Sequence, residues 1–272
     1  MDEPRFGMDA YAPAEIARRV EQAGVAKARL DAGRTLVLAG LAGAFVGLGA
    51  AFYTVVVADS GLAFSLERLL GGLAFCLGLI LIVLAGAELF TGNNLIAMAW
   101  AGRKLGAREL LRHWALVYAG NLAGAAATGA MVVASGVWAL DGGRVGEAAL
   151  AIAAGKAALG WGEAFVRGVL CNALVCLAVW LCFGARSTTD KVVAVVFPVT
   201  AFVALGFEHS VANMYFLPVG LMLAGAPGLS EAGPLWAGAA ANLAAVTLGN
   251  VVGGTLLVAA VYRWVYLRQG AG

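Results

Sequence analysis

The chain has 272 residues, of which 62% are hydrophobic and only 12% are charged. A soluble domain carries about 25% charged residues, so this chain has too few to cover a water-exposed surface. Its 38 glycines are typical of closely packed transmembrane helices, and a net charge of +2 offers no basic surface for nucleic acid. Composition therefore indicates an all-α integral membrane protein and excludes a soluble enzyme or a nucleic-acid-binding protein.

The N-terminal segment 1–34 is polar and stands apart from the rest of the chain. Arg18, Arg19 and Lys27 are interspersed with apolar residues such as Ile16 and Val20. This pattern predicts an amphipathic helix at the cytoplasmic surface of the lipid bilayer. The basic stretch is too long for a signal peptide, and no small-residue cleavage site follows a short apolar core.

Six long stretches without Lys, Arg or Asp follow, each near or above the roughly 20 residues that cross a bilayer. They are 35–58, 69–102, 113–140, 168–185, 192–230 and 232–262. With six spans, fourteen of the 18 Lys and Arg residues fall on the side of the N-terminus. The positive-inside rule then predicts a multi-pass protein of the cytoplasmic (inner) membrane with both termini in the cytoplasm. The four exceptions are Arg68, Arg144, Lys156 and Arg167.

Two of these stretches, 69–102 and 192–230, are too long for a simple crossing. As continuous helices they would extend about 50 Å or more, against a hydrocarbon core of about 30 Å. Their only charged residues, Glu88 and Glu208, lie near the middle, and His209 follows Glu208. Both features predict a broken helix, whose freed backbone groups must face protein or water. The alternative is a straight helix followed by an apolar loop, with each glutamate a satisfied core residue.

Two motifs recur in the same order along the chain. Gly-x-Glu-x4-Asn contains Glu88 and Asn93 and recurs in the second half with Glu208 and Asn213. Gly-Asn-x2-Gly contains Asn121 and recurs at a similar offset with Asn250. Three spans in each copy are an odd number, so the second copy must enter the membrane from the opposite side. We therefore predict a channel domain over 35–268, made of two inverted repeats over about 35–140 and 163–268.

Three Gly-x3-Gly pairs, at 43/47, 120/124 and 249/253, predict close helix packing. Four cysteines are scattered through apolar runs without a CxxC motif: Cys76, Cys171, Cys176 and Cys182. We interpret them as small buried hydrophobic residues rather than metal ligands, and expect no cofactor.

His209 is the strongest candidate for function. It lies at a predicted helix break, where ionisable residues usually serve transport, and a histidine exchanges protons near neutral pH. The alternative is a core histidine bonded to a carbonyl. We interpret His113, which follows Arg112 at the start of the third span, as a solvated residue without a role. The other buried polar residues either satisfy the freed backbone or face a pore: Thr91, Asn93, Asn94, Asn121, Asn172, Asn213 and Asn250.

Lys156 lies in an Ala-rich stretch that we expect to re-enter the membrane as a short helix. There it either attracts anions or is an ordinary surface lysine. An intramembrane hydrolase is the less favoured alternative to a transport path, because Ser135 lacks a Gly-x-Ser-x-Gly motif. Ser210 directly follows His209, and such neighbours point apart on a helix.

Three segments resemble signatures of the formate/nitrite transporter family: 86–94, 170–178 and 206–214. Residues 21–28 and 249–254 are similar to its formate-channel branch. The resemblance implies an aquaporin-like protomer in a homopentamer, with a pore in each subunit for formate and related small monovalent anions. It further implies that His209 is the central pore residue, that Thr91 is its hydrogen-bond partner, and that Lys156, Asn172 and Glu208 tune its charge. The apolar constrictions implied on either side of His209 are Phe75, Leu79, Leu89, Phe90 and Phe202.

An apolar constriction is costly for an anion, because burying a bare carboxylate has an idealised cost of about 20 kcal/mol. We therefore hypothesise that His209, oriented by Thr91 and Glu208, supplies a proton and that the neutral acid passes. The alternative is passage of the anion beside a cationic His209. The choice among formate, nitrite and hydrosulfide rests on the terminal stretches and stays open.

Overall fold

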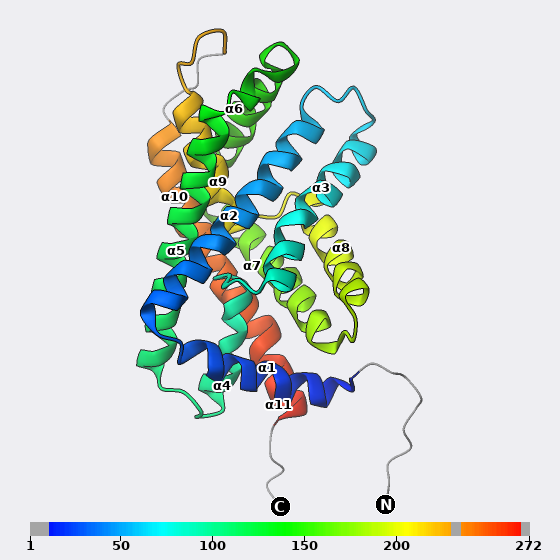
Figure 1. The fold of residues 1–272 in the computed structure, drawn as a ribbon, viewed down its shortest axis with the longest axis vertical. Helices are drawn as coiled ribbons and strands as arrows, with labels where there is room; N and C mark the ends of the chain where they lie inside the picture. Colours follow the sequence, from blue (N-terminus) through cyan, green and yellow to red (C-terminus); the bar gives the residue numbers. More distant parts are fainter. Residues whose placement is uncertain (1–10, 230–234, 268–272) are drawn as a thin grey trace, which may run out of the picture.

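The computed structural model describes residues 11–229 and 235–267, and these residues are helices joined by short connections, without a β-strand. The helices form an elongated bundle, and α1 lies across one end of it (Figure 1). The longer elements are α1 (Pro13–Ala28), α2 (Ala32–Val57), α3 (Phe64–Ala85), α5 (Ala107–Ala134), α6 (Arg144–Ala157), α7 (Trp161–Gly184), α8 (Thr188–Ala204), α9 (Ser210–Leu223) and α10 (Leu235–Val252). The shorter ones are η1 (Gly92–Ile96), α4 (Ala97–Ala101), η2 (Val137–Gly143), η3 (Gly253–Ala260) and α11 (Val261–Tyr266).

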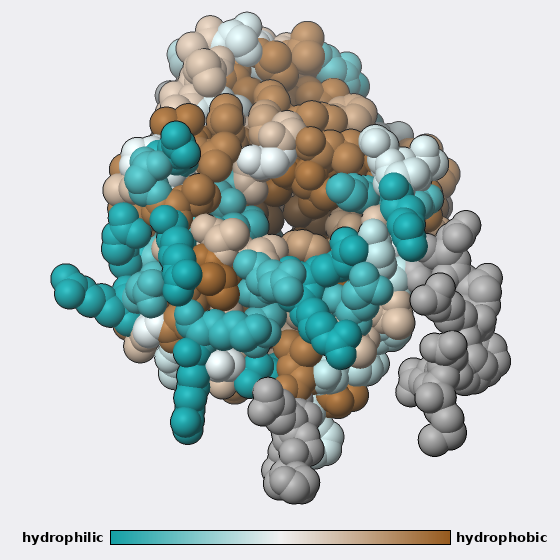
Figure 2. All heavy atoms as spheres, turned by 60° about the horizontal axis from the view of Figure 1, so that its bottom comes forward, coloured by the Kyte–Doolittle hydropathy of each residue, from teal (hydrophilic) through white to brown (hydrophobic). Residues whose placement is uncertain are grey.

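Five helical stretches are long and apolar enough to cross a membrane. They are Ala32–Val57, Phe64–Ala85, Ala107–Ala134, Trp161–Gly184 and Ala237–Tyr266. The predicted stretch 192–230 is divided between α8 and α9, and α9 is a shorter apolar helix of 14 residues. Figure 2 shows that hydrophilic residues gather at the end of the molecule where α1 lies, as an aqueous surface requires.

Both predicted helix breaks are present. The helix α3 stops at Ala85 because Gly86 adopts a left-handed conformation (φ +80°), and Gly206 (φ +71°) plays the same role after α8. Glycine takes this conformation without steric cost, whereas other residues rarely do. In Figure 1, α3 and α8 reach the middle of the molecule from opposite ends. The alternative of straight helices is therefore wrong.

Close packing of α2 with α5, and of α7 with α10, depends on the predicted small-residue motifs. A Cβ atom on Gly124 would lie less than 3.0 Å from the carbonyl oxygen of Gly40, and one on Gly249 would lie equally close to that of Phe165. Neither position can accept a side chain without separating the two helices. The Gly-x3-Gly prediction is confirmed, and the contacts lie within one chain.

The position of α1 differs from the sequence prediction. Its apolar residues Ile16, Ala17 and Val20 are buried against a cluster that includes Met98 and Trp180, so this face packs on protein and not in lipid. Protein atoms offer the close contacts that fluid lipid does not. Among the described residues, α1 ends at Ala28, and Asp31 caps a new helix, α2, at Ala32. Residues 1–10 lie outside the described part.

The four cysteines are buried and unpaired, which confirms their interpretation as small hydrophobic residues.

Candidate functional site

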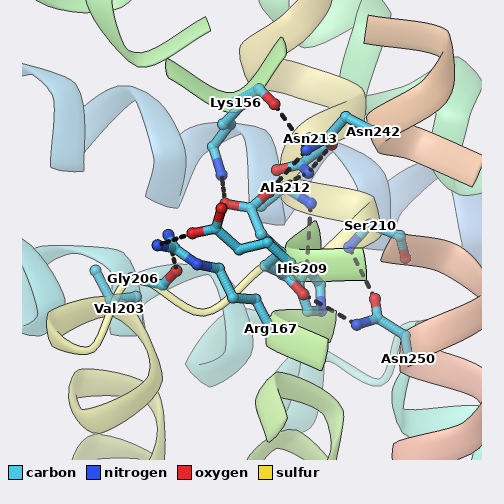
Figure 3. Close-up of polar contacts among 12 residues, drawn as sticks. Lys156, Arg167, Val203, Gly206, His209, Ser210, Ala212, Asn213, Asn242 and Asn250 are labelled. Atoms are coloured by element: carbon cyan, nitrogen blue, oxygen red, sulfur yellow. Dashed lines mark hydrogen bonds and ion pairs between the residues drawn. The ribbon is translucent and has the colours of Figure 1, made fainter. Parts of the chain in front are cut away.

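The histidine at the second helix break contacts the loop at the first. His209 Nε2 lies 2.8 Å from Thr91 Oγ1, and both side chains are buried. His209 also caps α9, because its Nδ1 accepts a hydrogen bond from the backbone N–H of Ala212 at 3.1 Å (Figure 3). Since Nδ1 is an acceptor, the neutral ring carries its proton on Nε2 and donates it to Thr91. This tautomer is set by the helix terminus.

Two asparagines hold the two breaks with the same set of hydrogen bonds. Asn121 Nδ2 donates to the carbonyl oxygens of Ala39 and Glu88, at 2.8 and 2.9 Å, and its Oδ1 accepts from Phe90 N at 2.9 Å. Asn250 Nδ2 donates to Gly168 O and Glu208 O, at 2.8 and 3.0 Å. Its Oδ1 accepts from Ser210 N at 2.8 Å (Figure 3). These side chains satisfy the backbone that the breaks expose. For Asn121 and Asn250, the alternative that the side chain satisfies freed backbone groups therefore holds.

The two glutamates are paired in a matching way. Glu208 Oε1 accepts from Lys156 Nζ at 2.8 Å, and Oε2 accepts from Asn213 Nδ2 at 2.7 Å (Figure 3). Glu88 Oε2 accepts from Asn93 Nδ2 at 2.6 Å and from Lys27 Nζ at 3.1 Å. Each buried carboxylate thus has a lysine partner, which offsets part of the cost of burying its charge.

Two cavities lie beside this centre. The α1-side cavity, of about 320 Å³, is lined by Lys27, Leu79, Glu88, Leu89, Asn93 and Lys191 among others. The α6-side cavity, of about 290 Å³, is lined by Arg68, Phe75, Lys156, Arg167, Phe202, Glu208 and His209 among others. Cations outnumber carboxylates on both walls, so both favour an anion electrostatically.

The aromatic residues predicted as constrictions occupy different places. The Phe75 and Phe202 rings pack edge to face, 5.8 Å apart, and Phe202 stacks on the His209 ring at 6.0 Å. Phe90 lines neither cavity, and its ring packs against that of Tyr118 at 5.0 Å. Thus Phe75, Phe202, Leu79 and Leu89 adjoin the cavities, and Phe90 lies behind them.

Asn172 is fully buried and connects helices. Its Nδ2 donates to Asn94 Oδ1 at 2.7 Å and to Asn250 O at 2.6 Å, and it lines neither cavity. Cys176, one turn further along α7, contacts the backbone of Thr91, because its Sγ lies 3.4 Å from Thr91 O. This geometry favours scaffolding over substrate contact.

The expectation that Glu208 orients His209 is wrong. The Glu208 carboxylate is bonded to Lys156, Asn213 and Asn242, whereas the partners of the His209 ring are Thr91 and Ala212. His209 has an extended backbone (φ −114°, ψ 116°). Successive side chains on an extended backbone point to opposite sides.

The interpretation of His113 as a solvated residue is also wrong. Its side chain is completely buried, with Nε2 3.0 Å from Asn93 Nδ2 and 3.6 Å from Glu88 Oε2. Neighbouring residues on a helix point in different directions, and here the exposed residue is Arg112.

Several charged residues of the site were missed as site residues. They are Arg68 and Arg167 in the α6-side cavity and Lys27 and Lys191 in the α1-side cavity. The sequence did contain a signal for the arginines of the α6-side cavity. Arg68 and Arg167 are two of the four exceptions to the positive-inside pattern, and Lys156 is a third.

Two broken helices that meet at a buried histidine, between two cation-lined cavities, define a membrane transport protein. A family model described as "Formate/nitrite transporter" matches residues 14–264. The chain belongs to the formate/nitrite transporter family. Members of this family are channels and transporters, so the intramembrane hydrolase alternative is wrong.

The chain is similar to named relatives over nearly its whole length. It is 38% identical to "Formate channel FocA" of Escherichia coli (strain K12), covering 96% of each chain. It is 37% identical to "Probable formate transporter" of Methanothermobacter thermautotrophicus, covering 97% of this chain and 100% of the relative. Among solved structures, "Pentameric formate channel with formate bound" matches with a TM-score of 0.78 and 40% identity, covering 87% of this chain and 98% of the other. "FNT family ion channel" matches with a TM-score of 0.82 and 28% identity, covering 92% and 98%.

Proposed function

We propose that this chain conducts formate and related small monovalent weak-acid anions across the cytoplasmic membrane. The observation that carries the proposal is the buried Thr91–His209 pair between two cavities, each with more cations than carboxylates on its wall. Similarity to formate channels over 96% of the chain supports formate as the substrate.

We further propose six spans in two inverted repeats, with both termini in the cytoplasm, and a homopentamer in which every subunit has its own pore. The matching hydrogen bonds of Asn121 and Asn250, and the opposite approach of α3 and α8 to the centre, support the repeats. The solved neighbour titled as a pentameric channel supports the oligomer.

In the proposed mechanism the anion enters a cavity, attracted by its cations, and passes the apolar residues Phe75 and Phe202 as a neutral acid. The neutral His209 ring has a single N–H, on Nε2, and it cannot give this proton away without becoming an imidazolate. Proton donation by His209 therefore requires that the ring first take up a proton at Nδ1. The N–H of Ala212 must then leave Nδ1, because two donors repel.

The alternative is passage of the anion itself beside a doubly protonated His209. Proteoliposomes with formate and pH gradients separate the two schemes. If the neutral acid passes, as proposed, about one proton enters with each formate. Formate conductance without proton movement would refute it.

Substrate preference is tested by competition. With labelled formate as the reference substrate, we expect unlabelled formate to inhibit uptake at lower concentrations than nitrite or hydrosulfide. A control with protein-free liposomes measures the background permeation of the neutral acids. If nitrite or hydrosulfide competes more strongly than formate, the formate assignment is wrong, while membership of the family stands.

Replacing Thr91 with alanine should reduce uptake only mildly and shift its pH dependence. A water molecule can replace the hydroxyl as the partner of His209 Nε2, and the Ala212 N–H still holds the ring. A matched control is Thr54→Ala, since Thr54 is also buried but, among the described residues, its hydroxyl bonds only to Ala50 O of its own helix. Uptake measured across a pH series checks the prediction. A Thr91→Ala profile identical to that of Thr54→Ala removes Thr91 from the site.

A further inference from the structure

Two polar side chains on the wall of the α6-side cavity have hydrogen-bond donors that no other described residue uses. They are Tyr53 of α2 and Arg68 of α3. The Tyr53 hydroxyl makes no hydrogen bond within the described part of the chain. Arg68 donates from Nε to Ala204 O at 2.9 Å and from Nη2 to Val203 O at 3.0 Å, so among the described residues Nη1 has no partner. A phenol O–H and the N–H groups of Nη1 are therefore available to a ligand in this cavity.

Arg68 is also the cation of this wall whose charge no described carboxylate offsets. Lys156 Nζ pairs with Glu208 at 2.8 Å. Arg167 Nη2 pairs with Glu163 at 2.5 Å. Arg68 forms no ion pair with a described residue, and the backbone carbonyls that it caps at the end of α8 carry only partial charges. An anion that enters the cavity thus meets one guanidinium whose charge is still unpaired.

Helix packing places the two side chains beside the same face of α3. A Cβ atom on Gly71 would lie 2.8 Å from Tyr53 Cε2, so the tyrosine ring occupies space that a glycine leaves open. Gly71 follows Arg68 by three residues, and residues at this spacing share a helix face. The guanidinium extends from this face to the second helix break, because a Cβ atom on Gly206 would lie 3.0 Å from Arg68 Nη2. Tyr53 and Arg68 therefore belong to one part of the wall.

Aromatic contacts connect Tyr53 to the centre of the site. The Tyr53 ring packs edge to face on Phe75 at 6.5 Å and on Phe216 at 5.9 Å. Lys156 Nζ lies 5.3 Å from the centroid of the Phe216 ring. Phe75 in turn packs on Phe202, which stacks on the central histidine. Tyr53 thus lies next to the apolar pair Phe75 and Phe202, in the part of the wall that Lys156 also reaches.

The α1-side cavity has no counterpart of the tyrosine and the arginine. Its cations are Lys27 and Lys191, and none of its described lining residues is a tyrosine or an arginine. The pair is therefore not a consequence of the internal repeat. A lysine acts as a compact point charge, whereas an arginine presents its N–H groups in a planar fork that matches the oxygens of a carboxylate. The α6-side cavity is thus the one equipped to recognise the shape of an anion.

We propose that Tyr53 and Arg68 form an oxyanion-binding subsite of the α6-side cavity, which favours small planar anions with two oxygens over hydrosulfide. The inference rests on the proposed function and adds a basis for its selectivity. The N–H groups of Arg68 Nη1 and the Tyr53 O–H donate to the anion oxygens and replace water that the anion loses before it passes Phe75. Hydrosulfide offers a single sulfur, which is a weak acceptor. The subsite accepts formate and nitrite alike, because both have two oxygens.

The direct test is Tyr53→Phe, which removes the hydroxyl and keeps the ring that packs on Phe75 and Phe216. Labelled formate uptake is measured in proteoliposomes at mildly alkaline pH, with hydrosulfide as the competing anion. We expect the KM for formate to rise about twofold to tenfold, as the loss of one hydrogen bond predicts, while the maximal rate and the inhibition constant of hydrosulfide stay constant. A structural defect would instead lower the maximal rate.

Tyr118→Phe is the matched control, because this tyrosine lines neither cavity and its hydroxyl bonds to Thr247 at 3.0 Å. Its KM for formate should equal that of the wild type. An unchanged KM in Tyr53→Phe overturns the proposal, and so does an equal rise in the formate KM and the hydrosulfide inhibition constant. Either result with normal uptake by the wild type refutes the subsite alone. A wild type that takes up hydrosulfide and not formate refutes the proposed function as well.

A double-mutant cycle tests whether the two side chains bind the same anion. Arg68→Lys keeps the charge and can still donate to a carbonyl oxygen of α8, but it lacks the planar fork. Its KM for formate should rise severalfold. In the double variant with Tyr53→Phe, the rise should be smaller than the product of the two single effects, because both changes weaken contacts to one ligand. Effects that multiply independently refute a shared subsite. If Arg68→Lys does not assemble, the KM of Tyr53→Phe decides the proposal.

Discussion

Replacing His209 with phenylalanine is expected to abolish pH-dependent formate uptake while the protein still assembles. Phenylalanine can stack on Phe202 as the imidazole does, so the packing survives. It offers neither a proton nor a hydrogen bond to the transported acid. A hydrogen bond to a charged group contributes about 1.5–3 kcal/mol, so uptake at neutral pH should fall roughly tenfold to a hundredfold.

The same change removes the cap of α9, because Nδ1 no longer accepts the Ala212 N–H. Loss of a cap costs about 0.5–2 kcal/mol and could by itself disturb the helix break. His209→Asn is the matched control, since asparagine is a good N-cap residue but cannot carry a proton. We expect His209→Asn to restore the stability and leave the pH-dependent uptake absent. Uptake in proteoliposomes across a pH series and thermal unfolding in detergent measure the two effects. Unchanged pH-dependent uptake in His209→Phe would show that the central assignment is wrong.

Replacing Asn250 with leucine should destabilise the protein and stop transport. The leucine is similar in size, but Gly168 O, Glu208 O and Ser210 N lose their buried partner. Each unsatisfied buried group costs about 1–3 kcal/mol, so the free energy of unfolding should fall by several kcal/mol. Glu208 and Ser210 directly precede and follow His209, so the remaining folded protein should transport poorly. Thermal unfolding and formate uptake of the purified variant measure both losses.

Two further variants separate this explanation from a general effect of mutating a membrane helix. Asn121→Leu should cause a similar loss, because Asn121 makes the same three bonds at the other break. Thr247→Val is the control on the same helix as Asn250, because within the described part of the chain its half-buried hydroxyl bonds only to Leu243 O and Tyr118. A stability of Asn250→Leu equal to that of Thr247→Val contradicts the role given to these asparagines.

Some features were predictable because they follow from the cost of placing polar groups in lipid. The two overlong apolar stretches with central glutamates predicted the breaks after Ala85 and Ala204. The paired Gly-x3-Gly motifs predicted the close contacts of α2 with α5 and of α7 with α10. The recurrence of Asn121 as Asn250 predicted a repeat, and their hydrogen bonds match atom for atom. Each of these depends on local sequence or on a period along the chain.

Other features depend on residues that are distant in the sequence. Lys27 reaches Glu88 only because α1 folds back beneath η1, and amphipathicity alone could not distinguish a protein surface from lipid. Beside Thr91, the His209 ring is oriented by the N–H of Ala212 and not by the Glu208 carboxylate, because the extended backbone at the break turns neighbouring side chains apart. Asn172 was expected at the pore, and it instead joins Asn94 to Asn250.

By itself, the sequence determined that this protein lies in a membrane, where its helices break and which residues recur in its two halves. These properties follow from the low dielectric of lipid, which penalises every exposed polar group and so fixes their positions along the chain. Only the tertiary structure decided which polar groups meet. The direction of each side chain at a helix break depends on backbone angles and on contacts with distant helices. The tertiary structure thereby distinguishes the two histidines: His209 is bonded to Thr91 between two cavities, and His113 is buried behind Glu88.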